Sequence, residues 1–183
     1  MAARVSELRY RLAIVAPTPA AVVEYLGGWV FDQVLAGWDT TVFVPTAADP
    51  RPLSILGAEL AELPCDAPPP APEARPHAVA VATELFEIDP RVHKSALATL
   101  TSGRSDLTFW GPGRPAELGA VLAQRDFVPS LAARAFKARA LAAAGLDRSA
   151  GAAERRYTKP PAVGRRSIRR SALPPDSRAS QSC

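Results

Sequence analysis

Residues 11–45 predict a strand, a helix and a second strand in direct succession, and this order constrains the fold more than any other part of the chain. The run 12–16 is continuously apolar, which is typical of a strand buried on both faces. Thr18 and Pro19 then supply a helix N-cap and a proline at the first helical position. Two strands joined by a helix run parallel in one sheet, so we expect an α/β protein.

The pairing of a capping residue with proline marks further helix starts, at Asp49-Pro50 and at Asp89-Pro90. The predicted helices after the first span about 50–56, 77–88, 90–100, 115–125 and 130–144. The predicted strands span 12–16, 41–44, 59–63 and 106–110. We therefore expect a small Rossmann-like three-layer unit, with about four mainly parallel strands in the order 3-2-1-4 and helices on both faces.

Proline content and charge divide the chain. Residues 64–76 hold six prolines, which predicts an exposed connecting loop. From Arg148 onward nine basic residues face two acidic ones, a net charge of +7, so residues 1–147 carry −3. The sequence predicts a Rossmann-like domain over 1–147 and a disordered basic tail over 148–183.

Cysteine content and hydropathy indicate the compartment. Only Cys65 and Cys183 occur, which is too few for a disulfide framework. The apolar run near the N-terminus ends at Pro17, and it is shorter than a signal peptide or a membrane span requires. We expect a cytoplasmic protein that does not contact a membrane, and the bias toward alanine, arginine and proline is typical of a high-GC bacterial genome.

The first strand-to-helix turn lacks the features of a dinucleotide site. Such a site needs glycines whose amides point at a pyrophosphate. Pro17 and Pro19 remove two of those amide donors, and Gly27 and Gly28 lie about two turns into the helix, where close packing is the more natural role. No phosphate-binding P-loop motif is present, so we expect no cofactor.

The loop "WGPGRP" at 110–115 is the best candidate for a ligand site. Ligands in an open α/β sheet lie beyond the carboxyl ends of the strands, where the strand order reverses. Arg114 would bind an anion through its guanidinium fork. The alternative is that the glycines form a simple turn and the tryptophan packs on the core. The candidate ligand-binding residues are Thr18, Thr46, Trp110, Gly111, Gly113 and Arg114.

No catalytic or metal-binding motif is recognisable. The two histidines, His77 and His93, have no cysteine or carboxylate at the spacing of a metal site, and no nucleophile elbow is present. We therefore predict a non-catalytic Rossmann-like binding or regulatory module, which leaves a protein partner open. The first alternative is an enzyme or sensor that binds a small anionic or nucleotide-like ligand at the carboxyl ends of the strands.

The second alternative is weak polyanion binding through the tail. The stretch "RRSIRRS" supplies cations for phosphate contacts, but it lacks aromatic residues to stack on bases, so specific nucleic-acid binding is not expected. The candidate polyanion contacts are Arg165, Arg166, Arg169 and Arg170.

Overall fold

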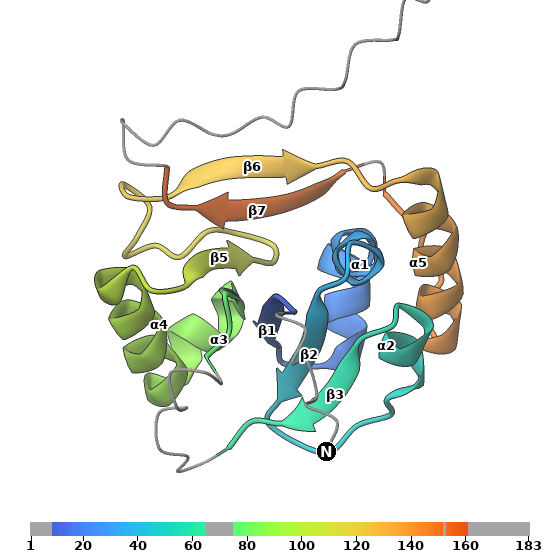
Figure 1. The fold of residues 1–183 in the computed structure, drawn as a ribbon, viewed down its shortest axis with the longest axis horizontal. Helices are drawn as coiled ribbons and strands as arrows, with labels where there is room; N and C mark the ends of the chain where they lie inside the picture. Colours follow the sequence, from blue (N-terminus) through green and yellow to red (C-terminus); the bar gives the residue numbers. More distant parts are fainter. Residues whose placement is uncertain (1–8, 65–74, 152, 161–183) are drawn as a thin grey trace, which may run out of the picture.

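The computed structural model describes residues 9–64, 75–151 and 153–160, and these form one mixed seven-stranded sheet flanked by helices (Figure 1). The strands are β1 (Arg11–Val15), β2 (Asp39–Val44), β3 (Glu59–Glu62), β4 (Ala78–Ala82), β5 (Asp106–Trp110), β6 (Ala123–Phe127) and β7 (Glu154–Thr158). The helices are α1 (Pro19–Leu35), α2 (Arg51–Ile55), α3 (Thr83–Ile88), α4 (Pro90–Ser102) and α5 (Leu131–Ala143).

The sheet order is β3-β2-β1-β4-β5-β7-β6. The neighbours from β3 to β5 pair in parallel, whereas β7 runs antiparallel to both β5 and β6. The order reverses between β1 and β4, because β1 is followed by strands on one side and β4 by strands on the other. Figure 1 shows α1, α2 and α5 on one side of the sheet and α3 and α4 on the other.

The first helix forms as its sequence predicts. Thr18 is extended and its Oγ1 accepts the amide of Ala21 at 3.1 Å, while Pro19 occupies the first helical position. Val22, Val23 and Leu26 are fully buried against the sheet. This stripe packs on the apolar side chains of β1 and β2, and the resulting burial is the main source of stability for such a layer.

Three expectations about the elements are wrong. Residues 77–88 form β4 and the short helix α3, whereas we expected one helix. Residues 115–125 form turns followed by the start of β6, also in place of a helix. Residues 154–158, which lie inside the expected tail, form β7 and pair with β5 and β6. The order 3-2-1 is confirmed, but β4 takes the fourth position that we assigned to 106–110.

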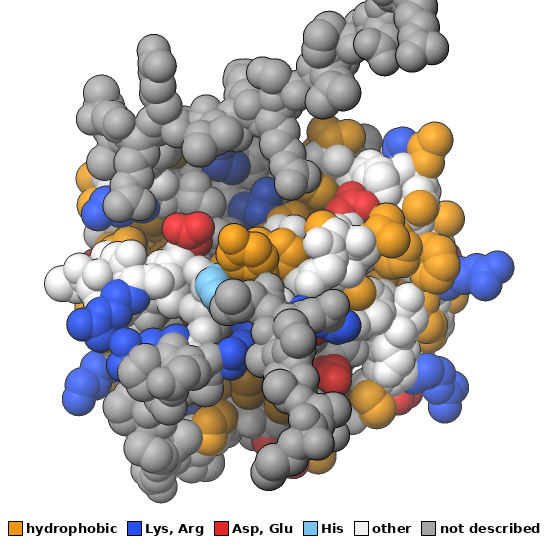
Figure 2. Space-filling model, in the orientation of Figure 1, with side chains coloured by type: hydrophobic (Ala, Val, Ile, Leu, Met, Phe, Trp, Pro, Cys, Tyr) orange, Lys and Arg blue, Asp and Glu red, His pale blue; other side chains and the backbone are white. Residues whose placement is uncertain are grey.

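Charged and hydrophobic side chains share the part of the surface that the described residues expose in Figure 2. Figure 2 shows lysine and arginine side chains spread over this face, with hydrophobic side chains between them. Each helix in the described part of the chain is too short or too polar to span a lipid bilayer. The four arginines that we assigned to polyanion contacts, at 165, 166, 169 and 170, lie outside the described residues.

Candidate functional site

The strand order reverses between β1 and β4, so the segments that leave their carboxyl ends diverge. Val15 pairs with Val81 at the ends of these two strands. The segments that leave them are the turn before Thr18 on one side and the start of α3 at Thr83 on the other. In open α/β sheets this is where ligands bind, because the two following connections diverge to opposite faces.

The turn after β1 offers few backbone donors to such a ligand. Pro19 has no amide hydrogen, the Ala21 amide is bonded to the Thr18 hydroxyl, and the Val22 amide reaches the Thr18 carbonyl at 3.4 Å. Thr18 itself is exposed at the tip of this turn. Ligand contacts from this side would therefore come from side chains more than from the helix amides.

Thr83 joins the end of β4 to the loop that follows β5. It is 5 % exposed, and its Oγ1 donates to the carbonyl oxygen of Gly113 at 2.9 Å. Our sequence prediction missed this residue because it lay inside the segment expected to be one helix. The alternation of Val79 and Val81 before it was the available signal for a strand.

The structure brings the predicted ligand residues to one edge of the sheet but not into one cluster. Thr46 is exposed beyond β2, and Arg114 is exposed beyond β5 with its guanidinium beside Gly119. The β1 and β5 ends are two strand spacings apart, or roughly 10 Å. We expected the loop after β5 to be adjacent to the β1 turn. The structure separates them, because β4 lies between β1 and β5.

Trp110 belongs to the core. It is 1 % exposed, and its ring lies 6.3 Å from that of Tyr25 on α1. Its Nε1 has no hydrogen-bond partner among the described residues. Gly111 is also buried and has a φ of 126°, a conformation that a residue with a side chain rarely adopts. The tryptophan is thus not placed to contact a ligand, and the glycine permits the sharp turn out of β5.

A histidine and a carboxylate meet in the segments that leave β4 and β5. His93 on α4 and Glu117 lie 2.8 Å apart, between Nε2 and Oε2. The Phe86 ring lies 4.6 Å from the imidazole ring, which restricts its position. The side chains are 36 % and 55 % exposed, so the pair is accessible to solvent and ligands. Sequence spacing did not reveal this pair, since the two residues come from separate elements.

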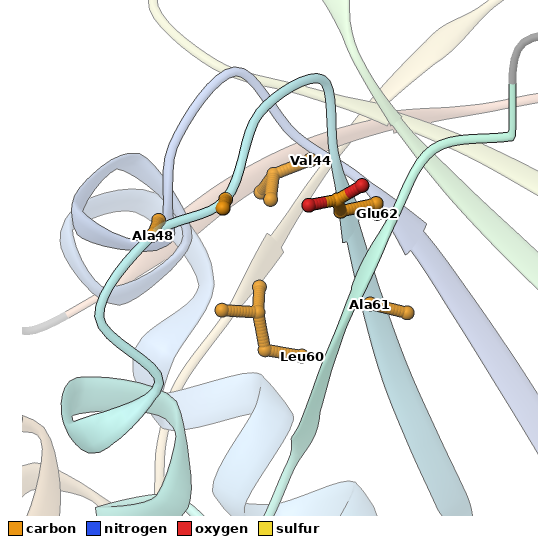
Figure 3. A pocket seen from close by; sticks show the side chains of 6 residues that line it. Val44, Ala48, Leu60, Ala61 and Glu62 are labelled. Carbon is orange, nitrogen blue, oxygen red and sulfur yellow. The ribbon is translucent and has the colours of Figure 1, made fainter.

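A shallow hollow lies at the same edge of the sheet, beyond β2 and β3 (Figure 3). It has a volume of about 170 Å³ and is lined by Val44, Ala47, Ala48, Leu60, Ala61 and Glu62. Glu62 is the single charged residue in this lining. The loop that carries Thr46 forms one wall, so this threonine is next to the hollow and far from β5.

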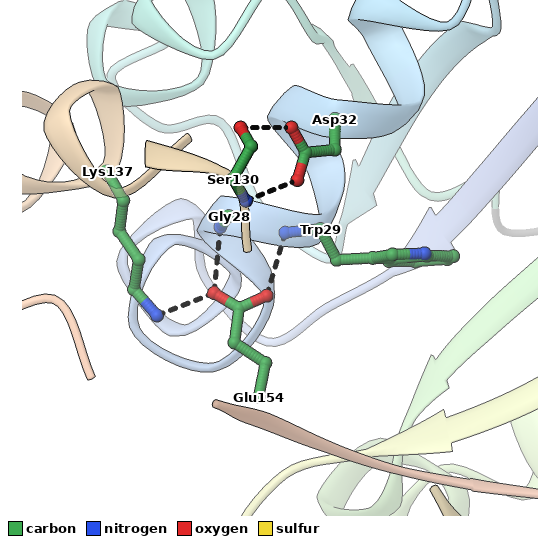
Figure 4. A network of polar contacts seen from close by, with 6 residues as sticks. All are labelled: Gly28, Trp29, Asp32, Ser130, Lys137 and Glu154. Carbon is green, nitrogen blue, oxygen red and sulfur yellow. Dashed lines mark hydrogen bonds and ion pairs between the residues drawn. The ribbon is translucent and has the colours of Figure 1, made fainter. Parts of the chain in front are cut away.

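A buried carboxylate fixes the position of α1 against β7 and α5 (Figure 4). Glu154 accepts the amides of Gly28 at 2.7 Å and Trp29 at 2.8 Å, and the ammonium of Lys137 at 2.7 Å. The side chains of Glu154 and Lys137 are 1 % and 3 % exposed. Two consecutive amides inside a helix thus donate to a side chain, an arrangement known to bend helices.

Close packing explains both glycines of this helix, as the sequence predicted. A Cβ on Gly28 would lie 2.5 Å from Pro129, and one on Gly27 would lie 3.1 Å from the stem of Lys137. Asp32 continues the junction by accepting the amide of Ser130 at 2.9 Å and its hydroxyl at 2.7 Å. The carboxyl-terminal half of α1 is therefore tied to the start of α5.

Arg156 extends the same cluster toward solvent. Its guanidinium carbon lies 4.5 Å from the centre of the Trp29 ring and 5.2 Å from that of Phe127. Burial lowers the pKa of this guanidinium, and the nearby Glu154 carboxylate partly opposes the shift. The network is a structural support for α1, since its charged groups are enclosed or stacked on aromatic rings.

The described residues contain no group of three histidine, cysteine, aspartate or glutamate side chains arranged to hold a metal ion.

Comparison with known proteins gives a likeness in fold. No protein-family model matches the chain, and no curated protein matches it in sequence. A deacetylase of teicoplanin biosynthesis in complex with teicoplanin has a TM-score of 0.54 at 11 % identity, over 81 % of this chain and 97 % of the other. The A40926 pseudoaglycone deacetylase Dbv21 has a TM-score of 0.54 at 16 % identity, over 81 % and 96 %.

A triple mutant of the teicoplanin-pathway deacetylase gives a TM-score of 0.52 at 11 % identity, over 81 % of this chain and 97 % of the other. At these identities the likeness establishes a shared α/β fold. It also corrects our expectation of a non-catalytic binding or regulatory module, because the solved structures that share the fold are enzymes. The chain is similar to these deacetylases in architecture.

Proposed function

We propose that the chain is an enzyme or a sensor that binds a small anionic or nucleotide-like ligand at the carboxyl ends of β1, β4 and β5. The observation that carries the proposal is the reversal of strand order between β1 and β4. The Thr18 hydroxyl and the exposed guanidinium of Arg114 lie along this edge. Arg114 would supply charge-assisted hydrogen bonds to the anion.

The anion would be held by side chains and not by the helix N-terminus. The first turn of α1 has a proline and two amides already accepted by Thr18. A phosphate-sized group placed near β5 would instead meet Arg114 and the loop whose Gly113 carbonyl is fixed by Thr83. Because the α1 turn offers few free amides and Arg114 lies near β5, we predict modest affinity for a bare pyrophosphate. A ligand long enough to reach from the β1 turn to the loop after β5 should bind more tightly.

The His93–Glu117 pair favours hydrolysis of an acyl group as a second candidate. With Glu117 accepting from Nε2, the other imidazole nitrogen is available as a base. It would take a proton from water as the water oxygen bonds to an amide carbonyl carbon. The imidazolium would give that proton to the amide nitrogen as the C–N bond breaks, which releases an amine and a carboxylic acid, and the acid would then lose its proton to solvent. The neighbours are named as deacetylases, which suggests an acetylated compound as the substrate class, and an N-acetyl group is the form chosen for the test.

One probe, UDP-N-acetylglucosamine, tests both candidates because it carries a diphosphate and an N-acetyl amino sugar. At a hundred times its dissociation constant it should stabilise the fold by about 2.7 kcal/mol, measured by thermal unfolding. Arg114→Ala should reduce this stabilisation, and Arg139→Ala on α5 is the matched control, since it removes an exposed cation elsewhere. Equal stabilisation of both variants would contradict the assigned edge.

Release of acetate separates the enzyme from the sensor. His93→Gln should abolish acetate release while UDP-N-acetylglucosamine still stabilises the fold. Binding without acetate release in the unaltered protein would indicate a sensor. Acetate release that His93→Gln leaves unchanged would remove the pair from the mechanism.

A further inference from the structure

A second hollow lies at the opposite edge of the sheet, beyond the amino ends of β2 and β3. Its volume is about 380 Å³, within the range of small-molecule sites. The lining residues are Arg9, Val34, Gly37, Trp38, Asp39, Thr40, Thr41, Gly57 and Glu59. Val34, near the end of α1, and Gly57, two residues after α2, are part of this lining. This hollow is separate from the edge assigned to the proposed function.

The lining contains a buried hydroxyl whose hydrogen-bonding capacity is unused. Thr40 is 4 % exposed, and its Oγ1 has no partner among the described residues. It is the first residue on the side of β2 that carries the buried Val42 and Val44. A buried hydroxyl without a partner costs stability, so a ligand that bonds to it would recover that cost.

The charges around the hollow favour a cation. Arg9 and Asp39 form an ion pair at 3.4 Å, and Glu59 adds a second carboxylate. Glu59 sits opposite Thr41 in the register of β2 and β3. The carbonyl end of the 17-residue helix α1 also points to this region, and helix C-termini stabilise positive charge.

The remaining groups are those that recognise a sugar. Thr40 and Thr41 supply hydroxyls, Arg9 supplies donors, and Trp38 supplies an aromatic ring. Gly37 has a φ of 90°, and a Cβ at this position would meet no atom within 4 Å, so space remains at the rim. We propose that this hollow binds a small amino sugar with a free ammonium group, the ammonium facing Glu59 and a hydroxyl bonding to Thr40.

The test titrates glucosamine, N-acetylglucosamine and glucose into the full ¹⁵N-labelled chain at about pH 6, where the amine of glucosamine is protonated. Glucosamine should bind most tightly and shift the amides of 38–41 and 57–59. Glu59→Gln should weaken glucosamine binding roughly tenfold or more, since it removes a charged hydrogen-bond acceptor. Glu62→Gln is the matched control at the other end of the same strand.

Thr40→Val keeps the shape of the side chain and removes the hydroxyl. It should weaken glucosamine binding by roughly threefold to tenfold without lowering the melting temperature, because the hydroxyl has no partner among the described residues of the free protein. The proposal would be overturned if glucosamine and N-acetylglucosamine bound equally tightly. It would also be overturned if the Glu59 and Glu62 variants lost the same amount of affinity for glucosamine. Arg114→Ala should leave glucosamine binding intact, which separates this site from the one at the carboxyl edge.

Discussion

Replacing Glu154 with glutamine should destabilise the protein strongly. The carboxylate accepts three hydrogen bonds, from two helix amides and one ammonium, and its side chain is 1 % exposed. A glutamine has one acceptor oxygen, and its amide group would face the remaining donors. Lys137 would become an unpaired buried charge. Removing one partner of a buried ion pair costs about 3–5 kcal/mol, which corresponds to roughly 6–20 °C in melting temperature at this chain length.

A double-mutant cycle separates the charge pair from the helix contacts. Lys137→Met should cost less than Glu154→Gln, because the carboxylate keeps its bonds to Gly28 and Trp29. The double variant should be more stable than Glu154→Gln alone by at least about 1 kcal/mol, since no unpaired ammonium remains. Urea unfolding followed by circular dichroism measures each free energy. A loss below about 1 kcal/mol for Glu154→Gln, or strictly additive effects, would show that the two side chains are not coupled in this way.

Three further predictions follow from individual contacts. Gly28→Ala places a Cβ 2.5 Å from Pro129, so urea unfolding should show a loss of about 1–3 kcal/mol. Hydrogen bonds from Arg91 lower the pKa of Asp89 in the folded protein. Their contribution to the free energy of unfolding is therefore fully present above the pKa of the unfolded chain, and it is lost as pH falls through the pKa of the folded protein. The stability difference between the unaltered chain and Asp89→Asn should therefore shrink on acidification, whereas Asp89→Ala should cost about 1 kcal/mol at neutral pH through loss of the N-cap. Thr83→Val should lower the free energy of unfolding by about 1 kcal/mol and raise the rate of amide hydrogen exchange in the loop after β5. Unchanged exchange would show that the hydrogen bond from Thr83 to Gly113 does not hold this loop.

Local signals in the sequence predicted the elements that they control directly. Thr18 and Pro19 fixed the start of α1, Asp89 fixed that of α4, and the apolar run at 12–16 predicted a central strand. Each of these depends on residues within a few positions of one another. The prolines at the first turn likewise predicted that few amides would be free there, and the bonds made by Thr18 agree.

Elements that depend on distant partners were missed. The alanine-rich stretch at 78–82 has a helical composition, yet it is a strand because β1 and β5 enclose it on both edges. β7 carries "ERRYT", which has no alternation of apolar residues, and its pairing with β5 and β6 specifies it. β6 is a polar edge strand, where charged side chains oppose further pairing.

The candidate site shows the same division. The reversal of strand order led us to the carboxyl edge of the sheet. Because we did not predict β4, we placed the loop at 110–114 one strand too close to β1. Trp110 was assigned to the ligand and lies in the core. The pairs His93–Glu117 and Lys137–Glu154 join separate elements, so no spacing along the chain predicts them.

The most direct test of a ligand site at the carboxyl edge of the sheet is to locate a bound ligand, at this edge or at the amino edge, by its effect on backbone amides. Amide chemical shifts of the full ¹⁵N-labelled chain would be followed during titration with UDP-N-acetylglucosamine. Side-chain recognition at the carboxyl edge predicts that the largest changes fall at Thr18, Thr83, Gly113 and Arg114. A diphosphate seated on the amides of 20–22, or shifts confined to other surfaces, would show that the ligand is held elsewhere or by other groups.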